Sequence, residues 1–169
     1  MVKYICFSMF KWVKIVKNQY LGLWLIGLAL FAIQELPYMI MPLIPLQTNP
    51  IMNMPTNSVF LDISEKIFGM LCVAVMVLIV HSDNKLFSVT TKSEITFFTI
   101  AVGTITLNFL GWILYFCGIQ TVAVMIVFIF ALPPLYYLFI GLWRKNYFLV
   151  GTASIFFAIH LSNAFVNLL

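Results

Sequence analysis

Hydrophobic residues in this chain form long runs that polar clusters interrupt at only a few places. The runs without charge, or with a single charged residue, cover residues 20–46, 67–80, 95–143 and 147–169. A membrane-spanning helix needs about 20 predominantly apolar residues. The run 95–143 therefore accommodates two spans, with a break at residues 117–120, where Gly118 is expected to stop a helix. The pattern predicts five transmembrane helices, at about 20–46, 59–80, 95–117, 120–142 and 147–168.

Prolines and charges modify two of these predicted spans. The second half of the first span contains Pro37, Pro42 and Pro45, and each proline removes a backbone donor, so we expect this end to be kinked or partly unwound. The charge-free core of the second span, residues 67–80, is short for a complete crossing. Its first turns, with Asp62, Glu65 and Lys66, are expected to lie among lipid headgroups or to face protein.

Residues 1–18 alternate lysines with bulky apolar residues. On a helical wheel the lysines and Asn18 cover roughly a third of the circumference, and apolar side chains cover much of the rest. This pattern is typical of a helix that lies on an anionic membrane surface. The alternative is a plain basic flank that fixes the orientation of the first span, and the two interpretations are compatible.

The composition supports a lipid environment. Hydrophobic residues make up 63% of the 169 residues and charged residues 8%, with a mean hydropathy of +1.08, whereas a soluble domain has about 25% charged residues. The sequence thus predicts an all-α fold, a polytopic membrane helical bundle whose first partner is the lipid bilayer. The net charge of +4 arises at the ends of apolar runs, so nucleic-acid binding is not expected.

The basic residues predict an orientation. With five spans, eight of the nine Lys and Arg residues fall on one side, and only Lys66 on the other. The positive-inside rule then places the amino terminus in the cytoplasm and the carboxyl terminus outside. We take a bacterial inner membrane as the working compartment.

A few polar side chains lie inside the predicted spans, where each needs a physical reason. The first, third and fifth spans run in the same direction, and Glu35, Asn108 and His160 lie at similar distances, about 20 Å, from the inner boundary at 1.5 Å per residue. We therefore expect a polar pocket near the outer face. Its predicted ligand-binding residues are Glu35, His160, Asn108, Asn163, Tyr38 and Tyr115.

Hydrogen bonds between helices are the simpler explanation for several of these groups. A buried asparagine commonly bridges two helices through one hydrogen bond, worth about 0.6 kcal/mol on average in membranes. This explanation suits Asn108 and Asn167. Glu35 differs, because a carboxylate at this depth costs several kcal/mol, on the order of 3 or more, unless it is protonated, paired or hydrated. The expected partner of Glu35 is His160.

No sequence motif indicates an enzyme, a metal site or a cofactor site. The zinc-protease, nucleophile-elbow and phosphate-loop motifs are absent from the sequence. The three cysteines, Cys6, Cys72 and Cys117, are far apart and suggest neither zinc nor a disulfide framework. The residues Tyr136, Tyr137, Trp143 and Tyr147 are expected to form an aromatic belt at the inner membrane boundary, and Trp24 to do the same for the first span.

Three functions remain open. The first is binding or transport of a small molecule through an outward-facing pocket, in which Glu35 binds a cationic or hydrogen-bonding group or carries a proton. Active transport would then require a partner membrane protein or a homo-oligomer. The second is an intramembrane enzyme that acts on a lipid-like substrate, with Glu35 and His160 as acid and base. The third is a non-catalytic interaction, assembly or immunity protein, in which the polar residues only join helices.

Overall fold

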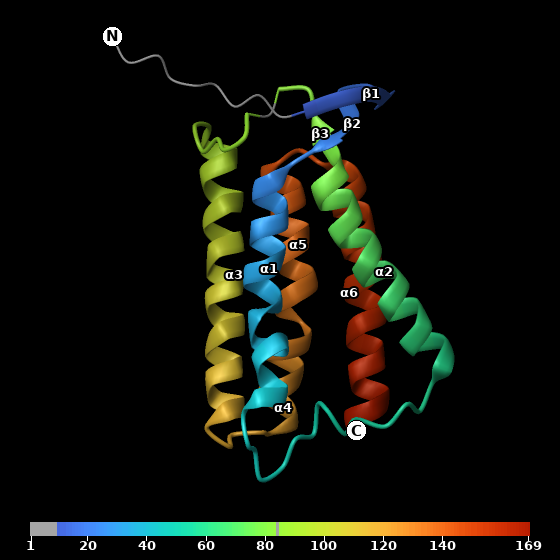
Figure 1. The fold of residues 1–169 in the computed structure, drawn as a ribbon, viewed down its shortest axis with the longest axis vertical. Helices are drawn as coiled ribbons and strands as arrows, with labels where there is room; N and C mark the ends of the chain where they lie inside the picture. Colours follow the sequence, from blue (N-terminus) through green and yellow to red (C-terminus); the bar gives the residue numbers. More distant parts are fainter. Residues whose placement is uncertain (1–9, 84) are drawn as a thin grey trace.

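The computed structural model describes residues 10–83 and 85–169 and is mostly helical, with one small sheet (Figure 1). Strands β1 (Phe10–Val16) and β2 (Gln19–Leu23) form an antiparallel hairpin, and β3 (Ile79–His81) pairs with β2. The sheet order is β1-β2-β3.

The amphipathic helix predicted over residues 1–18 is wrong for residues 10–18, and residues 1–9 lie outside the described residues. Residues 10–16 form β1 instead. The segment is rich in β-branched and aromatic side chains, which fit a strand better than a helix. Asn18 adopts a φ of 63° between the two strands, a conformation that asparagine tolerates and that lets the chain reverse. Pairing with β2 selects the strand here, and a helical wheel does not take such pairing into account.

The helices run back and forth between two ends of the molecule. The sheet covers one end, and the carboxyl terminus lies at the other (Figure 1). The helical elements are α1 (Leu25–Ile40), the 3₁₀ turn η1 (Met41–Leu43), α2 (Val59–Leu78), α3 (Lys92–Phe116), α4 (Val122–Val124), the π-helix η2 (Met125–Phe130), α5 (Leu132–Trp143) and α6 (Tyr147–Leu168).

Four helical stretches of the described chain are long and apolar enough to cross a membrane. They are Leu25–Leu43, Lys92–Phe116, Val122–Trp143 and Tyr147–Leu168. These apolar helices indicate membrane association. Helix α2 has a comparable length, 20 residues, but carries Asp62, Glu65 and Lys66 in its first half. The fold is therefore a helical bundle with an added sheet, rather than the purely α-helical bundle that the sequence predicts.

Local signals in the sequence explain most helix ends. Gly118 has a φ of 87° just after α3, which confirms it as the predicted stop. Ser58 caps α2, its hydroxyl oxygen accepting a hydrogen bond from the backbone of Leu61. Helix α1 begins five residues later than the predicted start at Tyr20, because Tyr20 and the residues that follow it belong to β2.

The fourth predicted span is interrupted. A π-helical segment, η2, precedes α5, where Pro133 and Pro134 occupy the first turn. In a π-helix the carbonyl of Phe128 would accept from residue 133, but proline has no N–H. The side chain of Asn108, on α3, supplies the missing donor, with its Nδ2 2.7 Å from the Phe128 oxygen.

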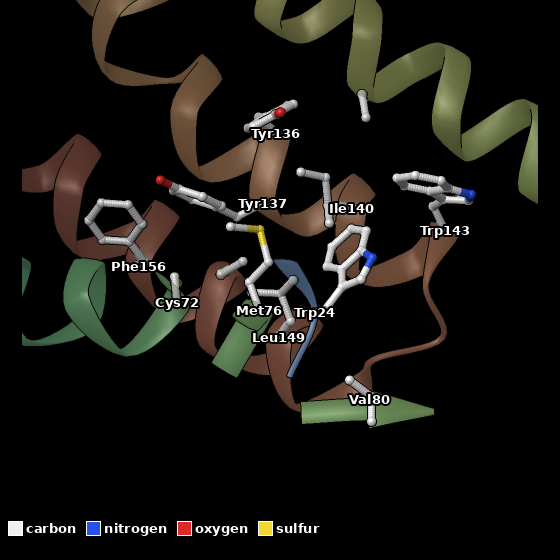
Figure 2. Packing of buried hydrophobic residues seen from close by; sticks show 12 residues of the cluster. Trp24, Cys72, Met76, Val80, Tyr136, Tyr137, Ile140, Trp143, Leu149 and Phe156 are labelled. Carbon is white, nitrogen blue, oxygen red and sulfur yellow. The ribbon is translucent and has the colours of Figure 1, made fainter. Parts of the chain in front are cut away.

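The main hydrophobic core lies beneath the sheet (Figure 2). Trp24 and Trp143 meet edge to face with ring centroids 5.8 Å apart, and the Arg144 guanidinium lies 4.6 Å from the Trp24 ring. Each tryptophan is only 2% exposed. Tyr136 and Tyr137 are also buried. The predicted aromatic belt is therefore wrong for these four aromatic residues, which belong to the protein core because helices pack around them, whereas Tyr147, the remaining predicted member, is 67% exposed.

Helix packing leaves room at the end of the bundle away from the sheet. Helix α3 packs on α5, α5 on α6, and α6 on α2, whereas α1 touches α2 and α3 only lightly. Figure 1 shows α2 and α6 on one side of the molecule and α1, α3 and α5 on the other. A cavity lies between these two groups of helices, lined by α1, α2, α5 and α6.

Candidate functional site

A partly open cavity of about 440 Å³ lies between α1, α2, α5 and α6. The loop between η1 and α2 contributes Ile51 and Met54 to its wall. Most of the wall is apolar and aromatic. Its polar or ionisable members are Gln34, Glu35, Tyr38, Glu65, Tyr137 and His160.

Two asymmetric interactions hold the Glu65 carboxylate, which projects from α2. One oxygen, Oε1, lies 2.9 Å from Nδ1 of His160 on α6. The other, Oε2, accepts a hydrogen bond from Nδ2 of Asn163, one turn further along α6. Asn163 in turn accepts from Asn167 at 3.0 Å. Because His160 and Asn163 are only 6% and 2% exposed, this cluster joins α2 to α6 by buried polar contacts.

The contact with Glu65 leaves the other nitrogen of His160 without a partner. Nε2 is buried and forms no hydrogen bond to any described residue. The ring lies beside Phe130 and Phe156, with centroid distances of 5.3 and 4.9 Å. A carboxylate at Nδ1 favours the tautomer in which Nδ1 carries the proton and Nε2 is an acceptor. His160 therefore lines the cavity with its ring orientation fixed, while its unsatisfied Nε2 is buried.

Glu35 lines the same cavity from α1. It is half-buried, and among the described residues it forms no hydrogen bond or ion pair. The sequence predicts His160 as its partner, but the structure pairs His160 with Glu65 because α2 packs directly against α6. The neighbouring Gln34 accepts a 2.8 Å hydrogen bond from the hydroxyl of Tyr137. This contact ties α1 to α5 and positions the turn that carries Glu35.

Tyr38 also lines the cavity, one turn beyond Glu35. Its ring packs edge to face against Trp112 of α3, with centroids 4.6 Å apart. This contact fixes the tyrosine ring at the cavity wall.

Three of the predicted ligand-binding residues do not line the cavity. Asn163 is one of them, although it donates to Glu65, which does line it. Asn108 is 1% exposed, and its side chain donates a hydrogen bond to the Phe128 carbonyl. It therefore bridges two helical segments, which is the alternative to ligand binding that the sequence analysis gives for this residue. Tyr115 donates a 2.6 Å hydrogen bond to Asn49 and accepts one from the backbone of Ile51. It thus anchors the loop that carries Ile51, and only indirectly shapes the cavity.

Sequence reasoning leaves Glu65 out of the predicted site. Its position near the end of a short apolar segment suggests a headgroup location. A further signal exists in the sequence, since Glu65, Gly69, Cys72 and Met76 recur at helical spacing and share one face of α2. Cys72 and Met76 on that face are buried in the core, and the face therefore turns Glu65 inward.

No group of three or more His, Cys, Asp or Glu side chains suited to a metal ion occurs within the described residues. Comparisons with protein-family models, curated protein sequences and solved structures find no match to this chain. The geometry of the cavity is therefore the basis of the functional argument.

Proposed function

We propose that this chain is a multi-pass membrane protein that binds a small molecule in the cavity between α1, α2, α5 and α6. The observation that carries the proposal is one largely apolar cavity lined by Glu35, which forms no hydrogen bond or ion pair among the described residues, and by His160, whose Nε2 is buried and unpartnered. Buried polar groups without partners cost free energy. A ligand that supplies partners would remove this cost, and a mostly apolar pocket with a few polar groups is the usual form of a small-molecule site.

The proposed topology has five spans, with α2 as the second, and an inner bacterial membrane as the compartment. The amino terminus is cytoplasmic and the carboxyl terminus outside. The support is the charge distribution, because the basic residues of the described chain other than Lys66 lie on the sheet and on segments at the same end of the bundle. The positive-inside rule assigns that end to the cytoplasm. The cavity then lies nearer the outer face.

Cysteine labelling in intact cells tests this topology. Cys117 is exposed at the end opposite the sheet, and Cys72 is buried. In a Cys6→Ser background, an impermeant maleimide should label Cys117 from outside. In a Cys6→Ser, Cys117→Ser, Lys145→Cys variant, labelling should require permeabilised cells. The reverse pattern contradicts the orientation.

Native mass spectrometry of the full chain in mild detergent tests binding. Wild type is compared with Glu35→Gln and with Gly69→Leu, because Gly69 lines the cavity and a side chain there would grow toward Phe156. The matched control is Gly103→Leu, since Gly103 has no atom within 4 Å of an added Cβ. A discrete extra mass on wild type and control that Gly69→Leu abolishes supports a ligand site. The same bound extra mass on all four proteins, or no extra mass on any of them, counts against a ligand site.

A second candidate is acid–base catalysis on a lipid-like substrate. It is favoured by the Glu65–His160 contact, because a carboxylate at Nδ1 that orients Nε2 is the arrangement by which histidine acts as a general base in hydrolases. Glu35, across the same cavity, would be the acid. Turnover with a bell-shaped pH dependence that Glu65→Gln and His160→Gln both abolish would establish catalysis. Ligand binding without turnover would leave the first proposal.

A further inference from the structure

We propose that the ligand of this cavity is a hydrophobic organic monocation with an N–H group, such as a protonated arylalkyl amine. This inference rests on the proposed function and specifies the ligand class. It depends on the charges, the aromatic lining and the hydrogen-bonding groups of the cavity wall.

The charges of the wall select a cation. Glu35 and Glu65 both line the cavity, and neither lysine nor arginine does. Glu65 is already compensated by His160 and Asn163. Lys66, the basic residue nearest along α2, points its amine to Asp62 instead. The half-buried Glu35 carboxylate is thus the one of the two that forms no hydrogen bond or ion pair with the described residues, and a charge held away from water is normally paired. A ligand with one positive charge would pair with it, whereas an anion would be repelled.

The aromatic lining favours an organic cation over a metal ion. Rings from four elements line the cavity, contributed by Phe31, Tyr38, Phe130, Tyr137 and Phe156. Aromatic faces attract ammonium groups within about 6 Å of the ring centroid, and apolar ligand carbon would pack against the same rings. A volume of about 440 Å³ is within the range of about 300–1,000 Å³ for pockets that hold drug-sized molecules.

Glu35 defines the hydrogen-bonding requirement. A protonated primary or secondary amine can donate an N–H to this carboxylate, and charge-assisted hydrogen bonds are stronger than neutral ones. A quaternary ammonium ion has no N–H to give. Nε2 of His160 is buried as well as unpartnered, so its surface is not open to a ligand.

The edge of the cavity fits an amphiphilic ligand. Among the residues that line the cavity, Met70 on α2 is 66% exposed and Phe31 on α1 is half-buried. The cavity therefore has an apolar rim beside the helices that the proposed topology places in lipid. A hydrophobic amine dissolved at the membrane interface would meet this rim directly.

Binding of three probes with one skeleton tests the class. The probes are 4-phenylbutylamine, 4-phenylbutan-1-ol and 4-phenylbutanoate, titrated calorimetrically into the full chain in uncharged detergent, with the Gly69→Leu titration subtracted to remove partition into micelles. The amine should bind about tenfold or more tighter than the alcohol, as expected for a charge-assisted contact, and the carboxylate should not bind. N,N,N-trimethyl-4-phenylbutylammonium should bind more weakly than the amine.

Matched variants separate the possible failures. Glu35→Gln should abolish the preference for the amine over the alcohol. Asp62→Asn, which removes a carboxylate of α2 that does not line the cavity, should keep this preference. Equal binding of amine and alcohol, lost in Gly69→Leu, would overturn the cation class while leaving the small-molecule site intact. No probe binding above the Gly69→Leu baseline overturns the cation class. If native mass spectra also show the same bound masses on wild type and on Gly69→Leu, the proposed function fails too.

Discussion

Replacement of Glu65 tests whether its hydrogen bonds to His160 and Asn163 stabilise the packing of α2 on α6. In Glu65→Ala, Nδ1 of His160 and Nδ2 of Asn163 both lose their acceptor. The two residues are buried, so neither donor has free access to bulk water. Glu65→Gln is the gentler change, because its amide oxygen can still accept from one of the two donors.

The expected loss of stability follows from these contacts. A buried donor left unsatisfied costs about 1–3 kcal/mol, and water that enters the partly open cavity should recover part of this. We expect a loss of about 2–4 kcal/mol for Glu65→Ala and about half of that for Glu65→Gln. A change of 1 kcal/mol shifts the Tm by roughly 2–4 °C for a chain of about 150–250 residues. The Tm of Glu65→Ala should therefore fall by about 4–16 °C.

Thermal unfolding in mild detergent, followed by tryptophan fluorescence, measures this shift. Trp24, Trp112 and Trp143 are all buried and report on core packing. Asp62→Asn is the control, since it removes a carboxylate from the same helix but disrupts only the exposed pair with Lys66, and exposed pairs contribute little. Equal shifts in Glu65→Ala and Asp62→Asn would refute the reasoning that Glu65 joins α2 to α6.

Three further predictions use the same unfolding assay. Gly111→Ala should destabilise the protein by about 1–3 kcal/mol, because the added Cβ would lie 2.3 Å from the Cβ of Phe128. Gly103→Ala is the control and should be neutral or slightly stabilising, because open space surrounds Gly103. Similar changes in stability for both variants would contradict the packing of α3 on η2. Asn108→Leu should cost about 1–3 kcal/mol, because the Phe128 carbonyl loses its donor, and an unchanged Tm would show that the carbonyl finds another partner. Burial lowers the pKa of His81 below its ordinary value, so the unfolded chain takes up the proton first as the pH falls, and stability attributable to His81 declines as the pH drops through the unfolded-state pKa. Wild type should therefore lose more stability than His81→Gln between pH 7.5 and pH 5.5, and parallel curves would contradict this.

Helix boundaries were readable where a local rule acts alone. Gly118 ends α3 because glycine adopts a positive φ at no steric cost, and Ser58 caps α2 because its hydroxyl reaches a free backbone N–H. Prolines in the first and fourth predicted spans mark the breaks at η1 and η2 for a similarly local reason. The hairpin is a different case. Residues 10–16 alternate in a way that also fits a helix, and only pairing with β2 selects the strand.

The candidate site was predictable in part. Glu35, Tyr38 and His160 do line one cavity, because polar groups in apolar helices turn toward protein rather than lipid. Depth along a span, however, says nothing about the direction in which a helix turns its faces. Asn108 lies at a similar predicted depth but meets Phe128, and Tyr115 meets the loop at Asn49.

The apolar helices, their approximate ends and the rarity of polar groups within them can be predicted from the sequence, since hydrophobic length and local backbone chemistry act over a few residues. Which polar groups meet depends on how the helices pack. The partner of His160 is Glu65 because α2 packs against α6, and Glu35 stays unpaired because α1 packs lightly beside them. Such pairings depend on helix rotation and neighbour choice, which are set by the packing of side chains far apart along the chain.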